Sequence, residues 1–481
     1  MKIKKIQYNC SNYIYKSMRH IYTIFLLFCS ITLTAQNALQ TFLRSNALRH
    51  ATVGFELREL ATGKTISAHN QQIACTPASV TKLITTATAL EVLGADYTFK
   101  TQLAIDGTID SSGVLHGNVY IIGGGDPTLG SRYFPKSDIF FFPWIDALHT
   151  AGIKRIEGNV IVDVSLYDKN PVPVLWLSED VGNHYAAGVF PFSVFDNTVS
   201  VDIKNGEKGI FLTKLSPSAY EFDKFNNVLK TGTKDSIYFF GEPYSDTRTI
   251  YGTMRPNSTR TEKCDISNPP LYFQQYFSET LIANGIEVLS KNVAAPLAEP
   301  VKSTIIYTHH SPPLKDIAAK TNFHSINNYA EHIAKHLALQ TDSIATFNAA
   351  LQFERNFWTK KGIDMSGVFL YDGSGLSPKN AITAAFVCDV LAQMRTNKNF
   401  RNSLPVAGES GTVAKFLAST PLKGKARVKS GSFRNVQCYA GYISHNEKDY
   451  AFCIMVNNFT GARAGVVALI EQLLVGSVGE F

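Results

Sequence analysis

The sequence contains no low-complexity tract, no solenoid-type repeat and no clear membrane-spanning run, which would need about 20 apolar residues. Its most apolar early stretch, residues 21–33, is shorter than that. Hydrophobic residues make up 45% of the chain and charged residues 18%, as in ordinary globular proteins. A length of 481 residues therefore predicts a folded protein with more than one domain.

Cysteine is scarce, and its spacing does not support a zinc site. Of the seven cysteines, two fall within residues 1–35, and the five that follow form no C-x-x-C pair. His332 and His336 are four residues apart but lack the H-E-x-x-H arrangement, so we interpret them as part of a helix face. An odd number leaves at least one free thiol. Cys388, Cys438 and Cys453 lie in apolar runs and are expected to be small core residues.

Residues 1–35 have the pattern of an export signal. Basic residues come first, the apolar stretch follows, and Thr34-Ala35 offers a small-residue cleavage site. Met18 is an alternative start, because the residues after it already make a complete signal. We therefore expect the protein in the periplasm or cell envelope. An N-terminal anchor that is never cleaved is the alternative.

A strong excess of one charge is also missing once this segment is removed. Residues 1–35 hold five Lys or Arg and no Asp or Glu, so the formal charge of +7 falls to 41 basic against 39 acidic residues, or +2. A nearly neutral chain is not expected to bind nucleic acid in general.

Two kinds of pattern divide the rest of the chain. Residues 51–67 predict a β-hairpin, and residues 79–93 show apolar positions at helical spacing. Between about 100 and 310, short β-rich runs are broken by Gly, Asn, Asp and Pro, which indicates a large and mainly β insertion. After residue 310 the pattern predicts helices at 314–321, 327–339, 343–361 and 384–395. Two strands follow at 438–444 and 450–457, and a closing helix at 465–474. These patterns predict one α/β catalytic domain, residues 36–102 and 309–481, split by the insertion.

Three short strings carry the chemistry: S-V-T-K at 79–82, S-I-N at 325–327 and K-S-G at 429–431. A serine hydroxyl is a poor nucleophile and needs a base within hydrogen-bond reach. Lys82 lies one helical turn after Ser79, but it acts as a base only if its pKa is lowered, and a cationic neighbour does this. Lys429, which we expect on a strand directly before the two strands at 438–444 and 450–457, is the candidate neighbour. Together the strings predict an acyl-transfer enzyme with a Ser/Lys pair.

The remaining side chains of these strings suggest roles around the reacting bond. Ser325 can carry the proton to the leaving amine, and Asn327 can hold a substrate amide and orient Lys82. Lys429 and Ser430 can hold a substrate carboxylate, and Gly431 lets the backbone approach the ligand closely. Backbone N–H groups at Ser79 and Ser432 are candidates for the oxyanion hole.

These strings resemble those of penicillin-binding proteins and serine β-lactamases. Four further strings are similar to the D-alanyl-D-alanine carboxypeptidase/endopeptidase family called DacB or PBP4, peptidase family S13, a low-molecular-mass class C group of penicillin-binding proteins. They are G-G-G-D-P-T-L at 123–129, G-N-V-I-V-D at 158–163, D-G-S-G-L-S at 372–377 and L-P-V-A-G at 404–408. The resemblance runs over nearly the whole chain after residue 35.

The resemblance implies a fold and an activity. The fold is a serine β-lactamase/DD-peptidase-like catalytic domain with two nested inserted domains, one at 103–187 and 262–308 and the other at 188–261. The activity is hydrolysis of D-Ala-D-Ala ends and D-Ala–diamino-acid cross-links of peptidoglycan through an acyl-enzyme at Ser79, which penicillins also form. It implies no metal or other cofactor.

The chain departs from the family pattern at positions next to the substrate. Ser430 stands where Thr is usual, and its hydroxyl is retained. Pro378 and then Lys379 follow the D-G-S-G-L-S string where relatives often have Arg. Lys379 can substitute for that arginine in holding a carboxylate, although it lacks the bidentate fork.

Three other residues are candidates to read the side chain of the diamino acid. Asp180 and Tyr185 resemble the family's side-chain readers, and Asp180 could bind an ammonium group. Arg434 is a further candidate for a carboxylate. Solvation at the surface is the alternative for each of them.

Two other functions remain open from the sequence. A β-lactamase or esterase on the same scaffold is weakened because no E-x-x-L-N string lies between Ser325 and Lys429 to activate a deacylating water. A peptidoglycan-binding protein without catalysis is weakened because all the catalytic side chains are present. The sequence also leaves open a homodimer, a peripheral membrane contact, the identity of the diamino acid, and the balance between carboxypeptidase and endopeptidase.

Overall fold

The computed structural model describes residues 36–136, 139–217, 224–290 and 302–479, so the export signal predicted at 1–35 lies outside the described residues. The chain divides into two compact units. Unit 1 contains the described residues up to Pro77 with Ala381–Thr396 and Leu404–Phe481, and unit 2 contains Ala78–Asn380 with Asn397–Ser403. Within the described residues, none of the helices combines the length and the hydropathy needed to cross a membrane.

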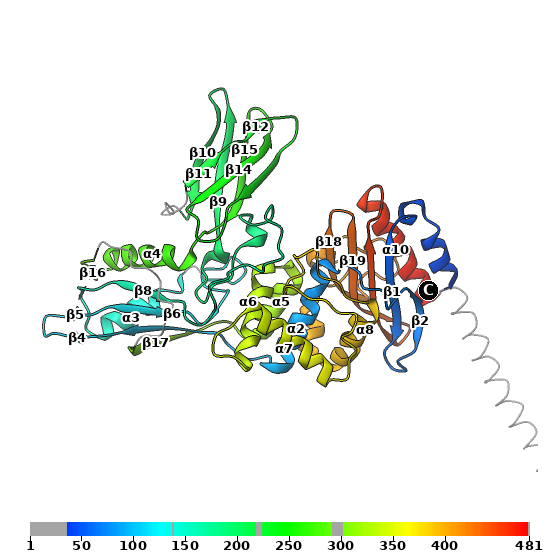
Figure 1. The fold of residues 1–481 in the computed structure, drawn as a ribbon, viewed down its shortest axis with the longest axis horizontal. Helices are drawn as coiled ribbons and strands as arrows, with labels where there is room; N and C mark the ends of the chain where they lie inside the picture. Colours follow the sequence, from blue (N-terminus) through cyan, green and yellow to red (C-terminus); the bar gives the residue numbers. More distant parts are fainter. Residues whose placement is uncertain (1–35, 137–138, 218–223, 291–301, 480–481) are drawn as a thin grey trace, which may run out of the picture. The chain divides into compact units, whose positions relative to one another are not determined.

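Unit 1 is built on an antiparallel five-stranded sheet (Figure 1). Its order is β18-β19-β20-β1-β2, with bounds Ala426–Phe433, Val436–His445, Lys448–Asn457, Thr52–Glu59 and Thr65–His69. Helix α8 (Ala384–Gln393) packs against β1 and β20, and α10 (Arg463–Val478) against β19. Because β20 is buried on both faces, its sequence is almost continuously apolar. The hairpin, the two late strands and the closing helix predicted from sequence are confirmed.

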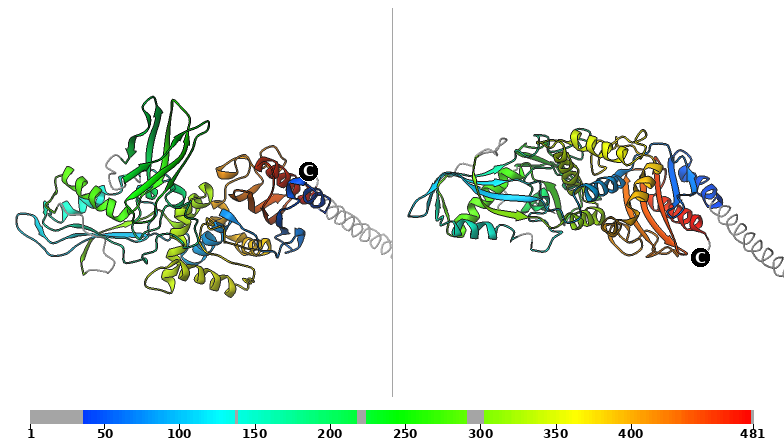
Figure 2. Two further views of the ribbon diagram at one scale, coloured as in Figure 1. Left: turned by 45° about the horizontal axis from the view of Figure 1, so that its top comes forward. Right: turned by 90° about the horizontal axis from the view of Figure 1, so that it is seen from below.

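Unit 2 has a helical part around a buried central helix, α2 (Lys82–Val92) (Figures 1 and 2). The surrounding helices are α5 (Leu314–His324), α6 (Asn327–Leu337), α7 (Phe347–Lys360) and α9 (Lys398–Ser403). Helix α2 carries buried threonines whose hydroxyls have acceptors. Thr86 donates to the Lys82 carbonyl and Thr88 to the Ile84 carbonyl within the helix, and Thr85 donates to the Gly373 carbonyl. The helix can therefore be enclosed on all sides although it is not wholly apolar.

The β-rich part of unit 2 begins where β3 pairs with β17, which brings the two ends of the insertion together. One sheet has the order β17-β3-β6-β8, with bounds Thr304–His310, Lys100–Ile105, Val119–Ile122 and Val160–Asp163. A smaller sheet has the order β16-β7-β5-β4, with bounds Glu287–Val288, Arg155–Ile156, Val114–His116 and Thr108–Ile109. Helices α3 (Phe142–Thr150) and α4 (Pro269–Ala283) supply aromatic core residues, among them Trp144 and Phe273.

Residues 198–265 form a module of two sheets within unit 2. One has the order β10-β9-β15, with bounds Gly209–Ser216, Thr198–Gly206 and Ser258–Asp265. The other contains β11, β14 and β12, with β13 paired to β14; their bounds are Lys224–Asn227, Thr247–Met254, Lys230–Thr231 and Ser236–Phe240. A buried ion pair links the sheets, with Arg248 Nε 2.6 Å from Asp265 Oδ1. The domain boundaries drawn from the resemblance stay a prediction.

Candidate active site

Ser79 lies in a strained turn that leads directly into the buried helix. The turn is a 3-10 helix, Ala78–Thr81, and the α-helix begins at Lys82. Ala78 has φ of 47°, in the left-handed region that costs a non-glycine residue energy and is often found at functional sites. The helix predicted over 79–93 is thus divided into a tight turn and an α-helix. The turn places the half-buried Ser79 hydroxyl beside the amine of Lys82.

The amine of Lys82 is held by three oxygen atoms. Its Nζ lies 2.9 Å from Ser79 Oγ, 2.6 Å from Asn327 Oδ1 and 2.6 Å from the backbone oxygen of Ser374. A carbonyl oxygen and an amide oxygen only accept hydrogen bonds, so they take two N–H groups of the amine. In the neutral form of Lys82 the lone pair is then left to face Ser79. This is the arrangement that a base needs to take the serine proton.

The orientation of the Asn327 amide is fixed from its other end. Asn327 is the first residue of α6, and its Nδ2 donates to the backbone oxygen of Tyr185 over 2.8 Å. Since Nδ2 has this acceptor, Oδ1 is the atom that faces Lys82. The residue that the sequence analysis assigned to orienting Lys82 therefore contacts it directly.

Burial sets the basicity of Lys82. The side chain is fully buried, and this lowers its pKa to about 7, while the nearby carboxyl groups of Asp372 and Glu331 act in the opposite direction. About half of the lysine is then neutral at pH 7, which a base requires. The cause differs from the cationic neighbour expected from the sequence: it is removal from water.

The loop at 372–377 closes over the Ser79 turn, and Asp372 organises it. Asp372 accepts hydrogen bonds from the backbone N–H groups of Gly375 and Ser377, from Asn380 Nδ2 and from Trp176 Nε1, at 2.6–2.9 Å. A Cβ at Gly375 would collide with the Ala78 carbonyl oxygen, so only glycine fits there. The loop can therefore present the Ser374 carbonyl to Lys82.

Glu331 supports the same loop from α6 and was missed in the sequence analysis. Its carboxyl oxygens accept from the backbone N–H groups of Gly373 and Ser374, over 2.9 and 2.7 Å. Burial, followed by the charge of Asp372, raises the pKa of Glu331, while these N–H donors lower it. Glu331 follows Asn327 by one helical turn, so the i,i+4 spacing was a signal that could have identified it.

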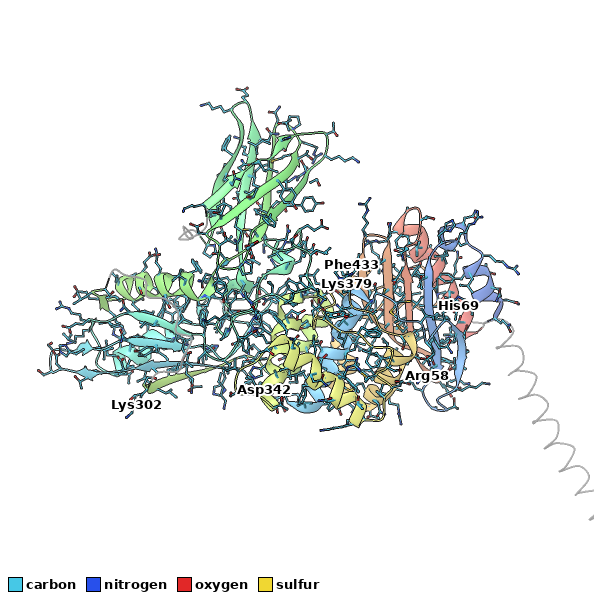
Figure 3. The ribbon with its side chains drawn as sticks, in the orientation of Figure 1. Arg58, His69, Lys302, Asp342, Lys379 and Phe433 are labelled. Atoms are coloured by element: carbon cyan, nitrogen blue, oxygen red, sulfur yellow. The ribbon has the colours of Figure 1, made fainter. Side chains whose placement is uncertain are left out.

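The predicted side-chain readers Asp180 and Tyr185 are joined to each other in unit 2. Tyr185 Oη donates to Asp180 Oδ1 over 2.9 Å, and burial raises the pKa of Asp180. The Tyr185 backbone oxygen accepts directly from Asn327, so Tyr185 adjoins the group formed by Ser79, Lys82 and Asn327. Lys379 follows the loop and has an exposed side chain (Figure 3).

Ser325 lies at the junction of α5 and α6. It is half-buried and adopts a left-handed conformation, with φ of 59° and ψ of 43°, as the C-cap of α5. This conformation ends one helix and allows the next to start two residues later at Asn327. The S-I-N string is thus a sharp turn between helices, as Ala78–Thr81 is a sharp turn before α2.

The third string lies on β18 of unit 1. Lys429 is buried and its Nζ donates to the Ser430 backbone oxygen over 2.7 Å, while Ser430 Oγ donates to Thr412 Oγ1 over 2.8 Å. Gly431 is opposite Cys438 on β19, and Ser432 and Arg434 are exposed. The predicted strand location of the string is confirmed, and the roles of its residues toward a substrate stay predictions.

The five cysteines of the described residues are buried and are not joined to one another by disulfides, and four of them lie in unit 1. The expectation that Cys388, Cys438 and Cys453 are small core residues is confirmed. His332 and His336 are likewise buried on α6, where His332 Nε2 lies 2.9 Å from Ser193 Oγ and His336 Nε2 lies 2.6 Å from Tyr97 Oη. These two histidines are structural residues of the helical part.

A serine in a strained turn, beside a buried lysine held by an asparagine and a carbonyl, defines a serine hydrolase of the Ser/Lys class. The model of the D-Ala-D-Ala carboxypeptidase 3 (S13) family matches residues 35–471. The chain belongs to this family.

Relatives and solved structures agree with that assignment. The D-alanyl-D-alanine carboxypeptidase of Actinomadura sp. (strain R39) is 27% identical over 446 residues, covering 88% of this chain and 81% of the relative. The crystal structure of penicillin binding protein 4 (dacB) from Haemophilus influenzae matches with a TM-score of 0.80 at 20% identity, over 93% of this chain and 99% of that one. The same protein complexed with a β-lactam matches with a TM-score of 0.76 at 21% identity and the same coverage. The predicted α/β fold of the DD-peptidase type is confirmed.

Proposed function

We propose that this protein is a serine-type D-alanyl-D-alanine carboxypeptidase that acts on the stem peptides of peptidoglycan. The observation that carries the proposal is the geometry of the Lys82 amine, whose N–H groups are taken by Asn327 and Ser374 while Ser79 Oγ lies 2.9 Å away. Membership of the S13 family supplies the substrate class.

The first step transfers the acyl group to the enzyme. Ser79 Oγ adds to the carbonyl carbon of the penultimate D-Ala, and its proton passes to the lone pair of Lys82 Nζ. The C–N bond of the terminal residue then breaks. The leaving amine takes a proton, carried from Lys82 by the Ser325 hydroxyl, and the shortened peptide remains as an ester on Ser79.

The second step uses water. A water molecule adds to the ester carbonyl while Lys82 again accepts a proton. The C–O bond to Ser79 breaks, and Lys82 returns the proton to Ser79 Oγ. In this scheme Lys82 must be neutral at the start of each step, which agrees with its pKa of about 7.

Specificity for a terminal carboxylate is assigned to the K-S-G string. Lys429 and Ser430 supply a cation and a hydroxyl on β18, and Gly431 supplies close backbone approach. In longer substrates a diamino acid replaces the terminal D-Ala. We expect its side chain to be bound by Asp180, Tyr185, Lys379 and Arg434. Cleavage of such cross-links would make the protein an endopeptidase as well.

β-Lactams are expected to acylate the same serine. A penicillin offers a strained amide that Ser79 can open by the first step, and the second step is then slow because the leaving group stays attached. The β-lactam complex of the Haemophilus influenzae protein is a precedent in a similar fold. The export signal predicted at 1–35 agrees with a site of action in the cell envelope.

A labelled penicillin tests the proposal against its alternatives. The expected result is a stable covalent adduct in the wild-type protein that is absent in Ser79→Ala. Rapid turnover of the penicillin would instead indicate a β-lactamase. Absence of an adduct with folded wild-type protein would indicate a binding protein without catalysis and would overturn the proposal.

A further inference from the structure

The module at 198–265 carries aromatic side chains on the outer face of its β13–β14 pair. Tyr238 and Tyr251 are directly opposite in the register, and their rings are stacked with centroids 5.7 Å apart and planes at 29°. Tyr238 is 45% exposed, and Phe240, two residues along the same strand, is 40% exposed. We call these three residues the tyrosine face.

Among the described residues of β13 and β14, none of the side chains on the outer side of the two strands is aliphatic. Side chains alternate between the two faces of a strand, so the core side receives Phe239 and Ile250, both buried. The outer side carries the aromatic rings with hydroxyl residues such as Ser236 and Thr249, which are opposite Thr253 and Phe240. Aromatic rings beside hydroxyl groups offer a ligand both apolar ring faces and hydrogen-bonding groups.

Residues 179–185 link the strand that carries Tyr238 and Phe240 to the candidate active site through hydrogen bonds. Asn183 is bonded to β13 in both directions: its Nδ2 donates to the Phe239 oxygen over 2.9 Å, and the Phe239 N–H donates to its Oδ1 over 3.0 Å. Burial raises the pKa of Tyr251, and the charges of Glu179 and Asp180 act in the same direction. Next to these two acids, the Val181 oxygen accepts from the Gly241 N–H, directly after β13, over 3.4 Å. Asp180 is bonded to Tyr185, and the Tyr185 backbone to Asn327.

The chemistry of this surface selects a neutral ring that carries hydroxyl or amide groups. The face of an aromatic ring is electron-rich and attracts C–H edges, such as those on the apolar side of a pyranose. Neighbouring carboxylates accept hydrogen bonds from hydroxyl and amide groups and repel anions. In peptidoglycan the stem peptide is attached to a sugar, so a substrate whose peptide lies in the active site brings a pyranose with it.

We propose that the tyrosine face binds a sugar ring of the glycan that carries the stem peptide. This inference rests on the proposed function, because it assigns a further part of the same substrate to a second surface. It makes the module at 198–265 a substrate-binding element. The enzyme would then distinguish a peptide on its glycan from a free peptide of the same sequence.

The test compares two substrates in three variants of the full chain. The substrates are a stem pentapeptide alone and the same pentapeptide on its N-acetylglucosamine–N-acetylmuramic acid disaccharide. The variants are Tyr238→Ala, Tyr238→Phe, which keeps the ring, and Phe211→Ala, which removes a ring that is 41% exposed on β10 of the other sheet. The readout is the ratio of kcat/KM for the disaccharide substrate over that for the free peptide.

The ratio is expected to exceed one in the wild-type protein and to fall about two- to tenfold in Tyr238→Ala, as for loss of one ring contact. Tyr238→Phe and Phe211→Ala are expected to keep the wild-type ratio. A ratio of one in the wild type, an unchanged ratio in Tyr238→Ala, or an equal fall in Phe211→Ala would overturn the inference.

A binding measurement separates this inference from the proposed function. Saturation-transfer NMR uses Ser79→Ala protein and the peptide-free disaccharide with its muramic acid carboxyl capped as a neutral amide. Sugar signals are expected, and they are expected to be weaker in the Ser79→Ala/Tyr238→Ala double variant. If the wild type hydrolyses neither substrate while these signals are present, the proposed function fails and the sugar site stands. Absence of the signals in Ser79→Ala overturns the sugar site.

Discussion

The titration of Lys82 provides the sharpest prediction for the chemistry at Ser79. Burial lowers its pKa to about 7, and acylation needs its neutral form. At pH 7 about half of this lysine is neutral, whereas about one ordinary lysine in three thousand is neutral at that pH. The structure therefore gives Lys82 about a thousandfold more neutral amine than an exposed lysine has.

The sign of the pH dependence follows from the lowered pKa. Lys82 is protonated below about pH 7 and neutral above it. The neutral fraction is about a tenth at pH 6, a half at pH 7 and nine tenths at pH 8. The acylation rate is expected to rise about fivefold between pH 6 and pH 7 and less than about twofold between pH 7 and pH 8.

Stopped-flow acylation by a fluorescent penicillin measures this rate without the later hydrolysis. Near-UV circular dichroism over the same pH range controls for unfolding. A rate that is flat between pH 6 and pH 8 would show that Lys82 is not the group that limits acylation. A rate that still rises tenfold per pH unit above pH 8 would show an ordinary lysine, and would refute the argument from burial.

Other substitutions test neighbouring parts of the account. Glu331→Gln removes a carboxyl group that raises the pKa of Lys82, so the midpoint of the acylation profile is expected to move to lower pH, as read by the same stopped-flow assay. Asn327→Ala removes the acceptor that orients the Lys82 amine, and the acylation rate at pH 8 is expected to fall about 100-fold or more, with an unchanged rate contradicting that role. Trp176→Phe removes one donor to the buried Asp372 carboxyl and is expected to lower the free energy of unfolding by about 1–3 kcal/mol in urea titrations, whereas a shift below the error would show that the other donors suffice. Arg248→Met leaves Asp265 buried without its cation, and a loss of about 3–5 kcal/mol in the same titration is expected.

The sequence was informative where a local pattern sets the structure. The hairpin β1–β2, the helices α5 to α8 and the strand that carries Lys429 follow from alternation, helical spacing and breakers. Ser79 and Lys82 could be paired because one helical turn brings them onto the same face. The S-I-N string identified Asn327 as a residue that could orient Lys82, and the structure places its Oδ1 2.6 Å from Nζ.

What the sequence did not reveal depends on contacts between distant residues. The Ser374 backbone oxygen is 292 residues from Lys82, and no side-chain pattern marks a carbonyl as a ligand. The lowering of the Lys82 pKa comes from the packing of α2 inside other helices, which the spacing of its own residues does not show. Strands β14 and β15 were missed because polar side chains such as Arg248, Arg260 and Glu262 occupy positions on the inner faces, so the apolar alternation is weak.

The most direct test of the central claim is chromatography of a disaccharide-pentapeptide and of a cross-linked muropeptide dimer after incubation with the purified protein. We predict release of D-Ala from the pentapeptide by the wild type and none by Ser79→Ala, and conversion of the dimer to monomers if the protein is also an endopeptidase. Folded wild-type protein that leaves both substrates intact would contradict the account.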